Sequence, residues 1–371
     1  MVLRLSMSSK FEVRRACHED SDQLLALMAG TSQEGSIELN FERSPNYFYA
    51  TEISTSDPDV WVMEDSASNE LAAVFSIGKR WVYVNGVKEL VRYGSDLRIH
   101  QDYQGGRTLY QLFKHYKDLM QSDWMQTVIL EENDASINTV SSGRLNLPTY
   151  YPFGRIVTHS IDSSRSISSD LANQVRPATQ SDVGIMQDFF NANAPLKQFY
   201  PHYDFSLIGS DHAYYRDIKF EDIFLLFKEN RLAGMCGAWD QKKFKQTRFV
   251  SYKGVMKFLR VMNNIKTYFS GGILLPKPGQ CGDYITLHSI LLEDNDSRLF
   301  LGLLSAIQQA YENRKYDAIT FGLDEKDSLN ASCKHLKGIR LYSQHFLASY
   351  GSNPVVDVIN QPIFYPEVGR L

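Results

Sequence analysis

Two glycines stand between an expected strand and an expected helix in the stretch QDYQGGRTLYQLF, Gln101 to Phe113. Gly105 and Gly106 free the backbone to bend, and the apolar residues that follow recur at helical spacing. The first turn of a helix exposes N–H groups and the positive end of the helix dipole, which together bind anions. The stretch therefore fits a backbone cradle for phosphate groups. The competing interpretation is a tight structural turn.

Other spacings exclude several kinds of site. The histidines show neither HxxxH nor HExxH spacing, and the 4 cysteines form no CxxC. We therefore expect no metal and no disulfide framework. No GxSxG is present either, so nothing indicates a serine nucleophile on a sharp strand-to-helix turn.

The composition is typical of a globular protein. The chain has 371 residues, of which 43% are hydrophobic and 22% charged, so it is long enough for two domains. A net charge of −4 argues against a nucleic-acid partner. The start is not typical of a signal peptide, and no uninterrupted apolar run approaches the roughly 18 residues of a membrane span. We expect a cytoplasmic protein without a membrane partner.

The chain contains one motif twice. FEVRRACHEDSDQLLALM and NQVRPATQSDVGIMQDFF both contain Val-Arg-x-Ala-x-x-x-Asp before an amphipathic helical pattern. The shared residues lie 162 positions apart: Val13, Arg14, Ala16 and Asp20 in the first copy, Val175, Arg176, Ala178 and Asp182 in the second. Val60–Ser76 also matches Ile223–Trp239, and within these ranges Leu71-Ala72-Ala73 pairs with Leu232-Ala233-Gly234 at an offset of 161. Two matches in nearly the same register indicate two copies of one domain.

We predict an N-terminal domain over residues 1–162, a Ser-rich linker over 163–174 and a C-terminal domain over 175–371. Each copy begins with a short strand and a helix, with Asp20 or Asp182 at the helix N-terminus. An aromatic helical segment follows (FERSPNYFYATE or KQFYPHYDFSLIG), then a hairpin, a strand, a long helix and a further strand. The predicted fold is mixed α/β (α+β), with helices flanking a mixed central sheet in each copy. The ending QPIFYPEVGRL is expected to form a closing edge strand, where proline is tolerated.

The second copy carries an insertion, FVSYKGVMKFLRVMNNIKTYFSGGILLPKPGQ, which increases the offset to about 191. The insertion is basic and aromatic. It fits a lid or a partner surface, and equally an elaborated loop and helix.

This order of elements, present twice, resembles the GCN5-related N-acetyltransferase (GNAT) family in tandem. The family pattern after the fourth strand is roughly V-x-P-x-Y-[RQ]-x-x-G-x-[GA]. Tyr103 and Gln104 fall on its aromatic and [RQ] positions, whereas Arg107 and Leu109 replace its two glycines. The resemblance covers both copies and implies acetyl-CoA or another acyl-CoA as co-substrate, with no metal.

The resemblance also implies which residues hold the cofactor. The pyrophosphate would lie on the backbone of residues 104–109, that is Gln104, Gly105, Gly106, Arg107, Thr108 and Leu109. Backbone N–H groups near Leu97, Arg98 and Ile99 would stabilise the oxyanion, and Asn133 would support the cofactor.

The expected catalytic residues are less closely matched. Asp96 is the candidate base, although a strand-end hydrogen-bonding role is as good an interpretation. The family places a tyrosine, the acid for the leaving thiolate, where this chain has Val140. We expect Tyr150, Tyr151 or a serine hydroxyl such as that of Ser141 to replace it, or the thiolate to leave without an acid from the protein. In the second copy the corresponding loop contains Asp294 and Asp296, which oppose an anion, so that copy is predicted to be degenerate.

The function that the resemblance implies is N-acyl transfer, with acetyl as the first expectation, from CoA to a primary amine of a small molecule or peptide. The alternative is a non-catalytic tandem module that binds a ligand or partner. The sequence leaves the acceptor, the acyl chain length and the oligomeric state open.

Overall fold

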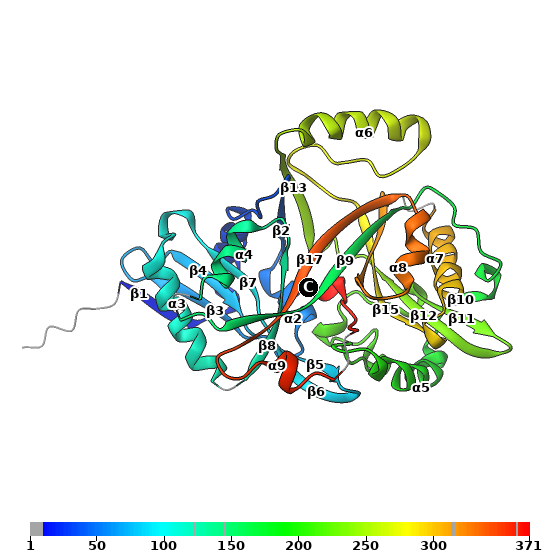
Figure 1. Cartoon of the computed structure of the whole chain (residues 1–371), viewed down its shortest axis with the longest axis horizontal. Coiled ribbons are helices and arrows are strands. Elements are labelled where there is room, and N and C mark those ends of the chain that lie inside the picture. Colours follow the sequence, from blue (N-terminus) through cyan, green and yellow to red (C-terminus); the bar gives the residue numbers. More distant parts are fainter. Residues whose placement is uncertain (1–9, 122, 144–145, 313–315, 361–362) are drawn as a thin grey trace, which may run out of the picture.

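The computed structural model describes residues 10–121, 123–143, 146–312, 316–360 and 363–371, apart from the side chains at positions 106 and 107. The described residues form a mixed α/β structure with sheets of four, ten and three strands. Figure 1 shows the two copies side by side, with β9 (Thr149–Asp162) and β17 (Gly338–Ser349) passing between them.

Apart from the aromatic segment of the second copy, the predicted elements occur in the predicted order, with further strands between them. The first copy contains β1 (Phe11–Arg15), α1 (Ser21–Ala29), β2 (Ile37–Glu42), α2 (Tyr47–Ser54), β3 (Val60–Asp65), β4 (Leu71–Ser76), β5 (Lys79–Val84), β6 (Val87–Tyr93), β7 (Ser95–Ile99), α3 (Gly106–Met120), β8 (Trp124–Leu130), α4 (Asp134–Ser141) and β9. The second contains β10 (Val175–Pro177), α5 (Val183–Asn193), β11 (Ile223–Lys228), β12 (Arg231–Trp239), β13 (Gln246–Tyr252), α6 (Met256–Ser270), β14 (Gln280–Cys281), β15 (Tyr284–Leu292), α7 (Ser297–Tyr311), β16 (Ala318–Asp324), α8 (Leu329–Ser332), β17 and α9 (Pro354–Asp357).

The repeated Arg and Asp of the sequence motif form the same ion pair in both copies. Arg14 Nη2 lies 2.8 Å from Asp20, and Arg176 Nη2 lies 2.6 Å from Asp182. Each carboxylate also accepts the backbone N–H three residues before it, at 2.8 Å, which fixes the start of the following helix. The hydrogen bonds from Arg14 lower the pKa of Asp20 to about 2, although partial burial opposes the shift.

The long helices pack one face onto the sheets, as their apolar spacing predicts. In α7 the residues Leu299, Phe300, Leu303, Leu304 and Ile307 are buried. Burying one such side chain stabilises the fold by roughly 1.5–3 kcal/mol. In α3 the same spacing buries Leu112, Phe113 and Tyr116. These faces hold both helices in place beside the strands that carry the candidate site.

The ten-stranded sheet joins the two copies, because their last strands are exchanged. Its order is β10-β11-β12-β15-β16-β9-β17-β8-β6-β5. Hence β9 pairs with β16 of the second copy, and β17 pairs with β8 of the first. A second connection is the small sheet β14-β13-β2, in which β2 pairs with β13 of the insertion region.

One strand of the first copy bends from the large sheet into the four-stranded sheet at Gly94. β6 runs parallel to β8 through Tyr93, and the Gly94 N–H donates to the Gln126 carbonyl at 2.8 Å. Directly afterwards β7 pairs with β4 instead. A Cβ at Gly94 would lie 2.7 Å from the Tyr116 hydroxyl and 2.8 Å from the Met125 sulfur, so a larger residue would displace these buried side chains. β7 and β8 therefore separate from this point.

Two expectations about elements are wrong. The aromatic segment of the second copy is not an α-helix: Pro201 interrupts it, and its described 3₁₀ turn covers only Phe205–Leu207. The described end of the chain, 363–371, contributes an isolated bridge at Phe364 and a turn at Val368–Arg370 rather than an edge strand. Pro366 cannot donate to a strand ladder, and the neighbouring side chains are buried instead.

Candidate functional site

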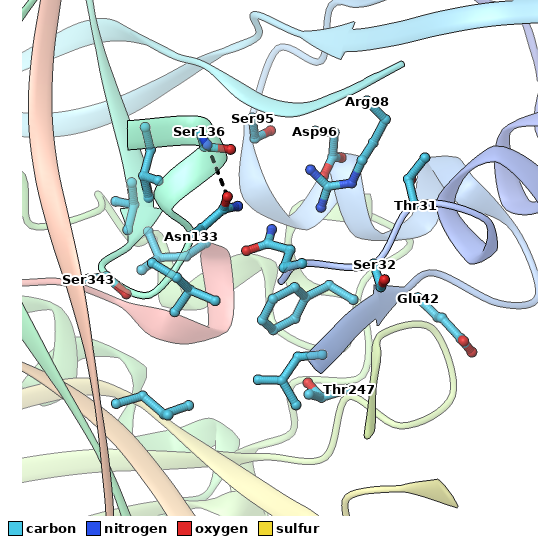
Figure 2. A pocket seen from close by; sticks show the side chains of 18 of the residues that line it. Thr31, Ser32, Glu42, Ser95, Asp96, Arg98, Asn133, Ser136, Thr247 and Ser343 are labelled. Carbon is cyan, nitrogen blue, oxygen red and sulfur yellow. Dashed lines mark hydrogen bonds between the residues drawn. The ribbon is translucent and has the colours of Figure 1, made fainter. Parts of the chain in front are cut away.

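A cavity of about 850 Å³ opens where β7 and β8 separate. Its walls come from both copies: β7, β8 and α4 of the first, and β13, β15 and β17 of the second. Figure 2 shows Asp96 and Arg98 beside one another, Asn133 and Ser136 joined by a hydrogen bond, and Thr247 and Ser343 contributed by the second copy. Of the residues expected from the sequence, the following line it: Asp96, Leu97, Arg98, Ile99, Gln104, Leu109, Asn133 and Tyr150.

The backbone of β7 turns one edge toward this cavity. The His100 N–H donates to the Ala72 carbonyl of β4 at 2.9 Å. Because N–H groups of a strand alternate in direction, the Arg98 N–H points to the same side as that of His100. The N–H groups of Leu97 and Ile99 then point away from β4, toward the gap between β7 and β8. Two parallel donors at the edge of a cavity suit a developing oxyanion.

Asp96 is held by two partners at the bend of β7. Its carboxylate lies 2.5 Å from Arg43 Nη2 and accepts the Tyr47 hydroxyl at 3.0 Å. Its backbone is left-handed, with φ of 55°. Burial alone would raise the pKa of Asp96, but the charges of Arg43 and Arg98 outweigh it and lower the pKa. Asp96 is therefore a weak base and a strong anchor for Arg43.

Arg43 has donors left over after binding Asp96. It is only 5% exposed, and its Nε and Nη1 atoms have no hydrogen-bond partner among the described residues. Arg98 likewise keeps an unpartnered Nε there, and its Nη1 donates to the Leu97 carbonyl at 3.0 Å. Both residues line the cavity. Two guanidinium groups beside one carboxylate leave this wall positive, which fits a ligand with a negative or strongly polarised oxygen.

Lys245 approaches the same wall from the second copy. It is half-buried and lines the cavity. Its Nζ donates to the Gly369 carbonyl at 3.2 Å and to the Leu371 oxygen at 2.5 Å. Burial, followed by the charge of Arg43, lowers the pKa of Lys245 to about 7. A lysine with such a pKa exchanges protons at neutral pH.

The glycine turn lies at the start of α3, beside the cavity. Gly105 is the N-cap residue, with φ of 150° and no atom within 4 Å of a Cβ built on it. Among the described residues no side chain caps this helix. Gln104 and Leu109 line the cavity, Thr108 is buried, and the side chain of Arg107 lies outside the described residues. The helix start is therefore open to an anion.

The remaining predicted side chains lie at different depths. The Asn133 side-chain oxygen accepts the Ser136 N–H at 3.0 Å and so caps α4 at the cavity wall. Tyr150 lines the cavity, and burial raises its pKa, so it keeps its proton at neutral pH. Ser141 does not line the cavity: its hydroxyl donates to the Ile137 carbonyl of the same helix at 2.6 Å.

The second copy contains the same bend, but its own chain fills it. Ser289 is left-handed like Asp96, with φ of 50°, and its N–H donates to the Glu367 carboxylate at 3.1 Å. Glu367 is buried against Arg370. At the start of α7, Asp296 accepts the Arg298 N–H at 2.8 Å and so caps the helix. The bend and the helix N-terminus, which are both open in the first copy, are thus both occupied by side chains of the protein in the second.

Sequence reasoning missed Arg43 and Lys245. Arg43 lies in FERSPNYFYATE, for which the sequence predicts only an aromatic helical segment, and Lys245 lies in the basic stretch QKKFK, which matches no motif. Only the pairing of β2 with β13 brings these distant segments to one wall. Among the described residues no group of three or more His, Cys, Asp or Glu side chains is placed to hold a metal ion. Nor does any helix in the described ranges have the length and apolar character needed to cross a membrane.

Comparison with solved structures finds the same fold. N-myristoyltransferase of Saccharomyces cerevisiae with bound myristoyl-CoA matches with a TM-score of 0.60 at 9% identity, over 98% of this chain and 86% of that one. A GCN5-related glucosamine N-acetyltransferase region of a fungal multi-domain GH3 β-N-acetylglucosaminidase matches with a TM-score of 0.58 at 11% identity, over 92% of this chain and 38% of that one. A GCN5-related N-acetyltransferase from Anabaena variabilis gives 0.50 at 11% identity, over 92% and 73%. No protein-family model and no curated protein sequence matches the chain.

Proposed function

Because the chain has the fold of tandem GCN5-related N-acetyltransferases, we propose that it transfers an acyl group from an acyl-CoA to a primary amine. The observation that carries the proposal is that β7 pairs with β4 and not with β8 among the described strands. Strand alternation then directs the N–H groups of Leu97 and Ile99 into the gap beside β8. The cavity at this gap also reaches Gln104 and Leu109 at the start of α3. The first copy could thus bind a thioester beside Leu97 and Ile99 and the phosphates of the same molecule beside the start of α3.

The pyrophosphate is proposed to bind at Gln104–Leu109. Gly105 leaves open space at the helix start, and no side chain of the described residues caps it. The free N–H groups and the positive end of α3 supply the attraction. Asn133, which also lines the cavity, supports the cofactor with its amide. In the second copy the N-terminus of α7 is not free to bind a phosphate, because Asp296 already caps it.

The reaction follows from the groups that line the cavity. The nitrogen of a neutral amine attacks the thioester carbonyl, a C–N bond forms, and the oxygen becomes an oxyanion held by the N–H groups of Leu97 and Ile99. The C–S bond then breaks, and the sulfur leaves as a thiolate that receives a hydrogen bond from Tyr150. Lys245 takes the proton that the amine loses, since its pKa of about 7 lets it act at neutral pH.

Asp96 has a positioning role in this proposal. Its lowered pKa makes it a poor proton acceptor, and its ion pair with Arg43 keeps that guanidinium at the cavity wall. Ser141 has no part in the reaction, because its hydroxyl bonds within α4.

The direct test is the release of free CoA thiol from acetyl-CoA, and from a long-chain acyl-CoA, with a panel of amines and amino-terminal peptides. Amine-dependent thiol release, matched by acylated product in mass spectra, supports the proposal. Binding of acyl-CoA without transfer to any amine would favour a non-catalytic module. Absence of both binding and transfer would exclude the transferase.

A further inference from the structure

The insertion of the second copy forms a hairpin that projects from the body of the protein. It leaves β13, forms α6, and returns through residues 271–279 to β14. Figure 1 shows α6 standing apart from the sheets. It is connected to β13 and to the returning segment 271–279, and Arg165 of the linker donates a hydrogen bond to the carbonyl of its last residue, Ser270. An isolated helix of this kind normally turns its apolar face toward the protein. α6 does the opposite.

The face of α6 that packs on the hairpin is polar. Arg260 Nε donates to the Pro276 carbonyl at 2.8 Å. Asn263 donates to the Ile273 carbonyl at 2.9 Å, and Asn264 both donates to the Leu275 carbonyl and accepts its N–H at 2.9 Å. These bonds fix the rotation of the helix about its axis, so its outward face is set by the fold.

The outward face of α6 is apolar and aromatic. Phe258 is 66% exposed, Tyr268 84% and Phe269 82%. These residues lie on one broad stripe together with further exposed apolar side chains: Val255, Leu259, Val261, Met262 and Ile265. Single exposed apolar residues are common on protein surfaces, whereas a contiguous stripe of this size marks a binding surface.

The segment that carries this stripe is basic, although two of its cations pair with acids outside it: Arg248 with Glu42 and Lys242 with Asp283. From Gln241 to Gly282 the sequence contains nine Lys and Arg residues and no Asp or Glu, although the whole chain has a net charge of −4. Lys257 and Lys266 are exposed and lie on opposite sides of the stripe. In the described part of the chain neither forms a salt bridge. Long cationic side chains in this position can extend from an apolar surface toward anionic groups.

We propose that the outward face of α6 docks on an anionic phospholipid membrane, with the helix lying in the plane of the interface. The exposed Phe, Leu, Ile and Met side chains would insert at the boundary between headgroups and acyl chains, and the flanking lysines would contact the negative headgroups. A 15-residue helix is about 22 Å long, too short to cross the roughly 30 Å hydrocarbon core. A second copy of the chain is disfavoured, because two such faces would bring lysines against lysines. This proposal departs from the sequence-based expectation of no membrane partner.

Docking would also orient the cavity. The returning loop contributes Ile273, Leu274, Leu275 and Pro276 to the cavity wall. One side of the hairpin thus carries the apolar face of α6, and the other side lines the cavity. With α6 docked on a membrane, the cavity would lie next to the headgroup layer. The inference goes beyond the proposed function and does not depend on it, because membrane binding is measured without acyl transfer.

The test is flotation of the full chain with phosphatidylcholine vesicles, either pure or containing about one third phosphatidylserine. The wild-type protein is expected to float with the anionic vesicles and to remain in solution with the neutral ones. The Phe258→Ser/Phe269→Ser variant is expected to bind at least tenfold more weakly. Its control is Leu196→Ser/Val356→Ser, which removes two exposed apolar residues elsewhere and should bind like wild type.

The charge is tested separately. Lys257→Gln/Lys266→Gln is expected to weaken binding roughly thirty-fold, since each lysine contributes about 1 kcal/mol near an anionic surface. Lys114→Gln/Lys334→Gln, at exposed lysines away from α6, is expected to have no effect. The proposal is overturned if the wild-type protein does not bind anionic vesicles, or if it binds neutral vesicles equally well. It is also overturned if the α6 variants bind as strongly as their controls. A dimer in light scattering that the phenylalanine substitutions dissociate, without vesicle binding, would assign the face to a second copy.

Discussion

The backbone N–H of Ile290 donates a hydrogen bond of 3.1 Å to the hydroxyl oxygen of Tyr365. Ile290 follows the left-handed Ser289, just as Leu97 follows the left-handed Asp96 in the first copy. The N–H that faces the cavity at Leu97 is thus matched in the second copy by an N–H already satisfied by the protein itself. One chain contains an open and a closed form of the same bend.

The closing segment is expected to be essential for stability rather than for ligand binding. Arg370 is fully buried, and its Nε donates to the Glu367 carboxylate at 2.8 Å and to the Tyr203 hydroxyl at 3.0 Å. Glu367→Ala leaves this guanidinium without its counter-ion and should lower the free energy of unfolding by about 3–5 kcal/mol. Urea unfolding measures the loss. CoA binding per folded chain should not change, and a second bound CoA in the variant would contradict the account.

Asp96→Asn is expected to destabilise the protein because it leaves Arg43 buried without its counter-ion. The expected loss at pH 7 is about 3–5 kcal/mol in urea unfolding. The pKa of Asp96 is lowered in the fold, so its contribution to stability is present above the unfolded value of roughly 3.9 and disappears as pH falls through the folded pKa. The difference between wild type and variant should therefore be constant from pH 8 to pH 5.

The control for this prediction is the double variant Asp96→Asn/Arg43→Met. Removing the unpaired charge should recover part of the lost stability, so the double variant should be more stable than Asp96→Asn alone. A difference between wild type and Asp96→Asn that already shrinks between pH 8 and pH 6 would show that another group carries the effect.

Lys245 is expected to set the acidic limb of the pH profile. The pKa of Lys245 is about 7. The value of kcat/KM should therefore rise with pH through about 7, as the Lys245 side chain loses its proton and becomes able to accept one. Lys245→Met should reduce kcat by about 10²-fold or more and remove that limb. Lys243→Met, at an exposed neighbour outside the cavity, is the matched control. An unchanged limb in the Lys245 variant would exclude it as the proton acceptor.

Tyr150→Phe is expected to slow the departure of the thiolate. Tyr150 lines the cavity and keeps its proton because burial raises its pKa. Loss of the hydroxyl should reduce kcat by about 10²-fold with little change in CoA affinity. Ser141→Ala should leave kcat at the wild-type level, because that hydroxyl bonds the Ile137 carbonyl. The reverse result, with Ser141→Ala inactive and Tyr150→Phe active, would transfer the role to the serine.

The parts of the fold that the sequence could predict are those encoded locally. Arg14 and Asp20 are close in sequence and form an ion pair, so their repetition at Arg176 and Asp182 revealed the tandem arrangement. The hairpin β3–β4 and helices α3 and α7 also follow from short-range patterns. The glycines of the turn correctly indicated where α3 begins.

The parts that could not be predicted depend on contacts between distant segments. No local pattern shows that β9 pairs with β16 and β17 rather than with β8. The ion pair of Arg43 with Asp96 spans 53 positions, and Lys245 reaches the same wall through the pairing of β2 with β13. The ending was expected to be an edge strand because prolines are tolerated there, yet its aromatic and charged side chains fill the closed bend instead.

Calorimetric titration of acetyl-CoA and a long-chain acyl-CoA tests the central claim most directly. The account predicts one site per chain, abolished by Gly105→Trp and retained in Gly209→Trp, a glycine of similarly unusual backbone (φ of 81°) with open space around it in the second copy. Thermal unfolding confirms that both variants are folded. Binding that survives Gly105→Trp, or two sites per chain, would contradict an acyl-CoA site confined to the start of α3.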